Sequence, residues 1–216
     1  VLVAYGPDKI LWKGLLYVIL SLIISPMLGL VFGTLFFKAT KRLSRNATPN
    51  AKHFFNRVQI LSSIGLSLSH GANDAQKSMG LIMMSLVILR LYPTFHIPFW
   101  VIASCAAAIA LGTASGGWRI IKTMGSKIYR LRSVHAFCAQ TSSGAVILGA
   151  ALAGGPVSTT HVVSSSIMGV GAGQRISAVR WGVAKNIVVA WFITIPAAAL
   201  MAGFSFFLIR IIHPSF

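Results

Sequence analysis

Long apolar blocks are the feature that most limits how this chain can fold. An α-helix needs about 20 apolar residues to cross ~30 Å of hydrocarbon, and 56% of the 216 residues are hydrophobic. No segment alternates with the period of a barrel strand. Helices are then the remaining way to span a bilayer, so the sequence predicts an all-α integral membrane protein. The blocks are residues 14–37, 58–89, 97–117, 136–173 and 186–209.

The net charge of +17 is concentrated between these apolar blocks. In a soluble protein such a charge suggests nucleic acid, but that function needs a continuous basic face or an aromatic platform. Neither is present, and we expect no nucleic-acid partner. The positive-inside rule instead predicts that three basic connections are cytoplasmic. Their basic residues are Lys38, Lys41, Arg42, Arg45, Lys52 and Arg57, then Arg119, Lys122, Lys127, Arg130 and Arg132, then Arg175, Arg180 and Lys185.

Counting crossings from these connections gives a multi-pass topology. The short turn around residues 90–98 and both termini are then outside, in what we expect to be the plasma (inner) membrane. The sequence divides into six parts on this basis. They are an N-terminal transmembrane helix (1–37), a cytoplasmic basic loop (38–57), a transmembrane region with a broken segment (58–117), a second cytoplasmic basic loop (118–135), a hairpin (136–173), and a cytoplasmic loop with the last transmembrane helix (174–216).

Asp74 is one of two acidic residues in the chain, and it lies in the middle of the block 58–89. A carboxylate inside a membrane is costly to desolvate, so a function is its default interpretation. The alternative is a structural ion pair with Lys77, three residues further on. Glycine followed by two short polar side chains is poor helix material. We therefore predict an interrupted helix near Gly71–Asp74, facing protein or a water-filled cavity.

The block 136–173 is also too long for one span, and it divides at Gly154-Gly155-Pro156. Both flanks are basic, which suggests either a re-entrant hairpin or a tight pair of spans. Pro156 suits the first position of a helix, which would place Ser158, Thr159 and Thr160 in its first turn. A helix N-terminus attracts anions. These hydroxyl residues are therefore candidate anion ligands, and the alternative is packing between helices.

Paired interrupted segments are typical of the binding site of a secondary transporter. The residues so far indicate a transporter of a small anion in which Asp74 serves a coupling cation. Two other classes are kept as alternatives: an intramembrane metal-dependent hydrolase built on His70, Asp74 and His161, and an ion channel. No metal-binding motif is present, and neither a metal nor a cofactor is expected. Close helix packing is expected at Gly65, Gly80, Gly112, Gly116, Gly144 and Gly149.

Two motifs carry a resemblance to a known family. The run His70-Gly71-Ala72-Asn73-Asp74-Ala75-Gln76-Lys77-Ser78-Met79-Gly80 resembles the GAND signature of the inorganic phosphate transporter (PiT) family. The run Gly155-Pro156-Val157-Ser158-Thr159-Thr160-His161 resembles that family's second signature. The later stretch from Arg180 to Pro196 is also family-like. The resemblance covers residues 58–203 and is to the C-terminal half of such a transporter.

The resemblance implies one of two inverted repeats, with phosphate bound between them. This chain has one copy of each motif, so an absent N-terminal repeat or a second copy of the chain is expected to complete the site, and a homo-oligomer is expected. Many family members have Glu at the position of Gln140. The resemblance implies a symporter that moves phosphate, or a metal–phosphate complex, with a proton or sodium ion.

The expected site has three groups of residues. Asn73, Ser158, Thr159 and Thr160 are expected to bind phosphate. Asp74, helped by Gln76 or Gln140, is expected to hold the coupling ion. The possible accessory residues are His70, Lys77 and His161.

Overall fold

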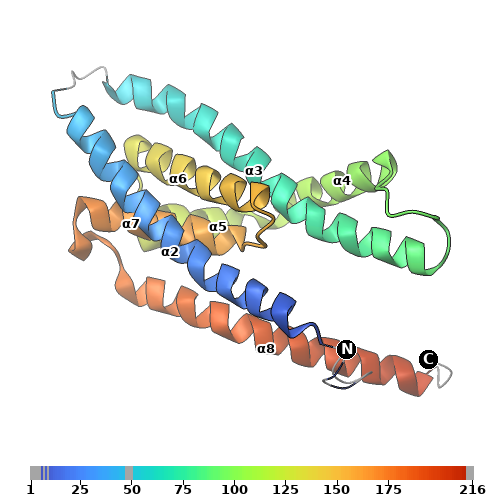
Figure 1. The fold of residues 1–216 in the computed structure, drawn as a ribbon. Coiled ribbons are helices and arrows are strands. Elements are labelled where there is room, and N and C mark those ends of the chain that lie inside the picture. Colours follow the sequence, from blue (N-terminus) through green and yellow to red (C-terminus); the bar gives the residue numbers. More distant parts are fainter. Residues whose placement is uncertain (1–5, 7, 9, 47–50, 213–216) are drawn as a thin grey trace.

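The expected all-α class is confirmed by the computed structural model, which describes residues 6, 8, 10–46 and 51–212 (Figure 1). The first residues of the expected 1–37 segment lie outside these ranges. The described elements are α2 (Trp12–Leu43), α3 (Ala51–Ile88), α4 (Phe99–Gly116), α5 (Trp118–Lys122), the π-helix η2 (Thr123–Ile128), α6 (Ser133–Leu152), α7 (Thr159–Gln174), the 3₁₀-helix η3 (Ile176–Ala178) and α8 (Trp181–Ile212).

Three of the described helices, α2, α4 and α8, are long and apolar enough to cross a membrane. Both α2 and α8 have 32 residues, or about 48 Å of helix. That exceeds the hydrocarbon thickness, so each must tilt or extend beyond it. Helices α3, α6 and α7 do not meet the same criterion of apolar length. The first polar motif lies on α3, and the second spans the turn between α6 and α7 and the start of α7. These three helices are the elements that build the candidate site.

The predicted interruption near Gly71–Asp74 is wrong, because α3 runs unbroken through it for 38 residues. The polar side chains that were expected to compete for the backbone bind other side chains instead. His70 and Lys77 lie one turn before and one turn after Asp74, and both contact it. Such pairs three and four residues apart stabilise a helix. The side chain of Asn73 points out of α3 to a different segment.

The predicted division at Gly154–Pro156 lies between α6 and α7, which form a helical hairpin. Gly154 has a φ of 69°, a left-handed conformation that a residue without Cβ adopts at little cost. Pro156 is not the first helical residue, however. The turn continues through Val157, and α7 begins at Thr159 with Ser158 as its N-cap. The hydroxyl of a serine at this position satisfies an otherwise free backbone N–H, which favours the later start.

The two expected basic loops are shorter than predicted. Helix α2 continues to Leu43 and α3 begins at Ala51, so the connection between them is residues 44–50. In the second expected loop, 118–135, α5 and η2 occupy the residues up to Ile128. Only residues 129–132 connect η2 to α6, which begins at Ser133. Basic residues are good helix formers, and they extend the helices beyond the apolar blocks on which the prediction rested.

The main helix contacts are between α2 and α7 and between α3 and α6. Glycines bring α2 and α7 together: a Cβ at Gly33 would lie 2.6 Å from the Ser166 carbonyl oxygen, and one at Gly169 would lie 2.2 Å from that of Leu30. The glycines expected at close contacts do not have this role. A Cβ at Gly144 would make only ordinary contact with Leu66, and nothing described lies within 4 Å at Gly65, Gly80, Gly112, Gly116 or Gly149.

Candidate functional site

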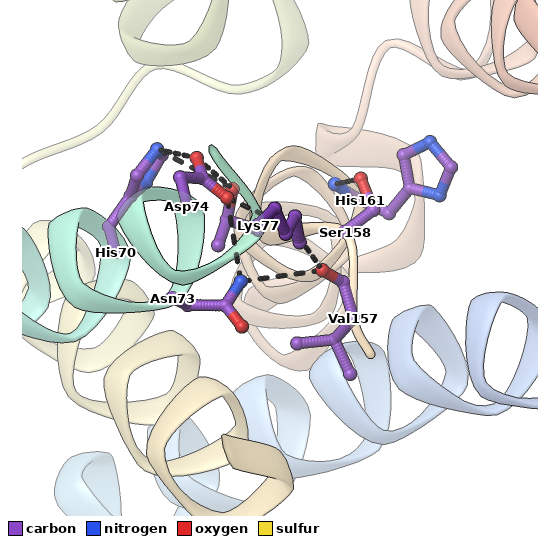
Figure 2. Close-up of polar contacts among 8 residues, drawn as sticks. His70, Asn73, Asp74, Lys77, Val157, Ser158 and His161 are labelled. Carbon is purple, nitrogen blue, oxygen red and sulfur yellow. Dashed lines mark hydrogen bonds and ion pairs between the residues drawn. The ribbon is translucent and has the colours of Figure 1, made fainter. Parts of the chain in front are cut away.

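One face of α3 carries the polar residues of the first motif. His70, Asn73, Asp74 and Lys77 follow the spacing i, i+3, i+4, i+7, which places their side chains on the same side of a helix. That face is directed at the turn that precedes α7, where the second motif begins (Figure 2). An unbroken helix therefore presents the motif to the hairpin without any local unwinding.

Asp74 contacts its own motif through both carboxylate oxygens and reaches the second motif through one of them. Its Oδ1 accepts a hydrogen bond from Lys77 Nζ at 3.1 Å. Its Oδ2 lies 3.0 Å from His70 Nε2 and accepts from Thr159 Oγ1 at 3.2 Å. The Lys77 ion pair considered as an alternative is thus present, and it exists together with a contact to the second motif. A partly exposed pair of this kind contributes little to stability by itself.

The Val157 carbonyl is a second point at which α3 meets the hairpin. It accepts from Lys77 Nζ at 3.1 Å and from Asn73 Nδ2 at 3.4 Å. Asn73 is buried, with 5% of its surface exposed. The unwound turn at residues 153–158 therefore has a carbonyl free to accept these bonds, which a helical carbonyl would not have.

The hydroxyl residues of the second motif have three different environments. Thr159 is buried against Asp74 and His70. Ser158 accepts a hydrogen bond from the His161 backbone N–H at 3.5 Å, which is its capping bond. Thr160 is exposed. The backbone N–H groups of Thr159 and Thr160 have no intrahelical acceptor, because α7 begins at these residues.

The two glutamines expected to help Asp74 do not lie beside it. Gln76 is two residues after Asp74, or about 200° around a continuous helix, and it is exposed. Gln140 Oε1 accepts from Ser62 Oγ at 2.6 Å. Ser62 precedes Asp74 by three turns of α3, or about 18 Å. Gln140 instead lines a cavity of about 470 Å³ between α3 and α6, with Gln59, Ser63 and Ser67.

The sequence reasoning missed two members of this region. One is the Val157 carbonyl, which no side-chain pattern could indicate. The other is Trp191 of α8, whose ring stacks on His161 with centroids 4.0 Å apart. Trp191 lies within the stretch 180–196 that resembles the family, and this was the available signal. The stacking fixes the His161 ring against α8, and its Nδ1 is buried with no hydrogen-bond partner among the described residues.

The site can bind an anion through hydrogen-bond donors and a positively charged side chain. It can bind a cation through the carboxylate of Asp74. The donors are Asn73 Nδ2, Thr159 Oγ1 and the free N–H groups at the start of α7, and the positively charged side chain is that of Lys77. Within the described ranges, no group of three or more His, Cys, Asp or Glu side chains is placed to hold a metal ion. A polar helix–hairpin site beside apolar helices that are long enough to cross a membrane is typical of a membrane transporter.

The comparisons with known proteins identify the family. The sequence pattern of the "Phosphate transporter family" matches residues 43–202. The chain belongs to this family, in agreement with the resemblance found in its motifs. The match is to transporters and not to enzymes, so the hydrolase alternative is not supported.

Relatives and a solved structure agree with this assignment. The chain is 47% identical over 204 residues to a "Probable low-affinity inorganic phosphate transporter" of Rhizobium meliloti (strain 1021), covering 94% of the chain and 61% of that protein. It is 41% identical over 211 residues to a protein of the same name from Bacillus subtilis (strain 168), covering 97% and 63%. A structure named "The sodium-dependent phosphate transporter" has a TM-score of 0.84 and 25% identity, covering 98% of this chain and 70% of that one.

Proposed function

We propose that the full-length protein carries inorganic phosphate across the cell membrane together with a cation, by alternating access. The chain spans about three fifths of the relatives named above, 61% and 63% of their lengths. The remainder of the protein, or a second copy of the chain in a homo-oligomer, would supply the second repeat and complete the phosphate site between the two. The observation that carries the proposal is the 3.2 Å contact between Thr159 Oγ1 and Asp74, because it joins the two motifs in one site.

In the proposed mechanism, phosphate and cation bind to different halves of the same ion pair. Lys77 neutralises Asp74 when phosphate is absent. An arriving phosphate would compete for Lys77 and for the donors of Asn73, Thr159 and the α7 N-terminus. Asp74 would then be free to take a proton or a sodium ion. Each ligand would therefore favour binding of the other, because the coupling between two binding sites is reciprocal.

The other expected residues have supporting parts in this proposal. Ser158 and Thr160 would bind phosphate through the turn and the first residues of α7, and His70 and His161 would hold Asp74 and the turn in place. Gln140 would bind the cation on its route, since it lines the cavity between α3 and α6. Gln76 lies on the opposite side of α3 from Asp74, so it would contribute to ion binding only by contacting the second repeat. The transported species would be free phosphate or its metal complex.

Uptake of labelled phosphate by the full-length protein in proteoliposomes tests the proposal. Asp74→Asn and Thr159→Val should each reduce the initial rate roughly tenfold or more, since the first removes the charge of the carboxylate and the second removes the hydroxyl that donates to it. Ser85→Ala is the matched control, because it removes a hydroxyl from the same helix that bonds only to the Leu81 carbonyl. Unchanged uptake by both site variants would overturn the proposal.

The coupling ion and the channel alternative are tested in the same vesicles. A sodium gradient and a pH gradient are imposed separately, and the one that accelerates wild-type uptake identifies the ion. Loss of this acceleration in Asp74→Asn is expected if the carboxylate holds the ion. Saturable uptake without single-channel currents distinguishes a transporter from a channel.

A further inference from the structure

A second cavity, of about 1360 Å³, lies where the three basic connections of the chain meet. We call it the basic cavity, and its polar lining includes Lys41, Tyr129, Arg130, Arg132, His135 and Arg175. Lys41 comes from the end of α2, the next four from the segment between η2 and the first turn of α6, and Arg175 from the end of α7. Each basic connection therefore contributes at least one cation to the same space, although the connections are far apart in sequence.

The four cations of the basic cavity have no acidic partner among the described residues. Asp74 pairs with His70 and Lys77, and Asp8 precedes α2, at the opposite end of that helix from Lys41. Like charges held close together repel, and an anion that binds among them removes this repulsion. The cavity has room for such a ligand, since small-molecule sites typically enclose about 300–1,000 Å³.

Tyr129 places a directed hydrogen-bond donor among these cations. The Arg132 backbone N–H donates to His135 Nδ1 at 3.2 Å, so that nitrogen has no proton. The proton of the neutral ring is then on Nε2, which donates to Tyr129 Oη at 3.3 Å. The hydroxyl hydrogen of Tyr129 is left for a ligand. Burial raises the pKa of Tyr129, which keeps the phenol protonated.

The Tyr129 ring is also held in position. A Cβ at Gly171 would lie 3.2 Å from the ring, so α7 approaches it closely. His135 packs against its edge with ring centroids 5.0 Å apart. Only 8% of the Tyr129 surface is exposed. The donor is thus fixed before any ligand binds, which reduces the entropy lost on binding.

We propose that the basic cavity binds a phosphoryl group, with Arg130, Arg132 and Arg175 neutralising its charge and Tyr129 donating a hydrogen bond to one of its oxygens. Arginine pairs with phosphate oxygens through two parallel N–H donors, which suits it to this ligand. The group could belong to a phospholipid headgroup at the membrane surface or to free phosphate. The cavity contains none of the residues placed in the transport site, so this proposal is independent of the proposed function.

The lipid source is tested on purified full-length protein by native mass spectrometry, with equal amounts of phosphatidylglycerol and phosphatidylcholine as probes. Phosphatidylglycerol should be retained selectively. The triple variant Arg130→Gln, Arg132→Gln, Arg175→Gln should lose about a hundredfold in affinity, since each cation contributes about fivefold. The matched control, Lys122→Gln with Lys127→Gln and Arg180→Gln, removes the same charge from residues that do not line the cavity.

The free-phosphate source is tested by equilibrium dialysis with labelled phosphate, in an Asp74→Asn, Thr159→Val background that removes the proposed transport site. Tyr129→Phe is added in both arms because it keeps the ring and deletes only the donor, and it should weaken binding about tenfold. If the cavity variants lose binding of one probe and the control does not, the proposal is supported and that probe identifies the source of the phosphoryl group. If the cavity variants bind both probes as the control does, the proposal is overturned.

Discussion

Ser158 shows how a helix boundary decides the role of a single residue. The sequence placed it inside the first turn of a helix that begins at Pro156, with its hydroxyl free for an anion. The helix begins at Thr159 instead, and the Ser158 hydroxyl accepts a hydrogen bond from the His161 N–H. This bond satisfies one of the free N–H groups of α7, and it fixes the turn that carries the Val157 carbonyl.

We expect Ser158→Ala to destabilise the full-length protein by about 1 kcal/mol, because the N-cap of α7 is lost. Ser158→Thr retains the hydroxyl and should preserve most of the stability. Thermal unfolding of the purified protein measures both, with Ser85→Ala as the control for hydroxyl removal elsewhere. A stability of Ser158→Ala equal to that of the control would show that the cap contributes nothing.

Asp74 and Thr159 were predictable as a pair, and Gln140 was not placed correctly. A lone carboxylate and a cluster of hydroxyls are conspicuous in apolar sequence, and the structure brings them to 3.2 Å. The grouping of Gln140 with Asp74 had no comparable basis, because a polar residue on α6 can meet α3 at any level along its length. Ser62 is the residue that it meets. Register between helices depends on packing that a sequence does not display.

Helix α3 is the element on which local propensity was most misleading. Gly71, Asn73 and Asp74 are individually unfavourable in a helix, and these residues were expected to break it. In the structure, His70 and Lys77 compensate Asp74 along the helix, and Asn73 bonds to Val157 across the interface. The break at Gly154–Pro156 was predictable, in contrast, because neither a glycine pair nor a proline has a side-chain partner that could restore the helix.

The contact between α2 and α7 depends on glycines that the sequence did not single out. We expect Gly169→Ala to cost about 1–3 kcal/mol of stability, since the added Cβ would lie 2.2 Å from the Leu30 carbonyl and must push the helices apart. Gly65→Ala is the matched control, because nothing described lies within 4 Å of its Cβ position. The control should gain slightly from better helix propensity. Equal unfolding temperatures for the two variants would contradict the close approach.

At the scale of the whole molecule, the three basic connections meet at one end. Lys41, Arg132 and Arg175 line one cavity, so the ends of α2 and α7 and the start of α6 lie together. The turn at residues 89–98 lies at the opposite end of α3 (Figure 1). The clustering of basic residues between the apolar blocks was visible in the sequence. Their meeting in one cavity was not, because it depends on the hairpin of α6 and α7, which brings the start of α6 and the end of α7 to the same side. The positive-inside rule predicts that this end is cytoplasmic.

Cysteine labelling of the full-length protein tests that orientation. Ser126→Cys and Ser177→Cys place exposed thiols near the basic end, and Thr94→Cys places one at the opposite end. A membrane-impermeant thiol reagent should label Thr94→Cys in intact cells, and the other two only after permeabilisation. Cys105 and Cys138 of this chain are buried, and all native cysteines are replaced by alanine as the background. Labelling of all three positions from the same side would contradict a fold whose two ends face opposite sides of the membrane. If Ser126→Cys and Ser177→Cys are labelled in intact cells and Thr94→Cys only after permeabilisation, the fold stands and the orientation given by the basic residues is inverted.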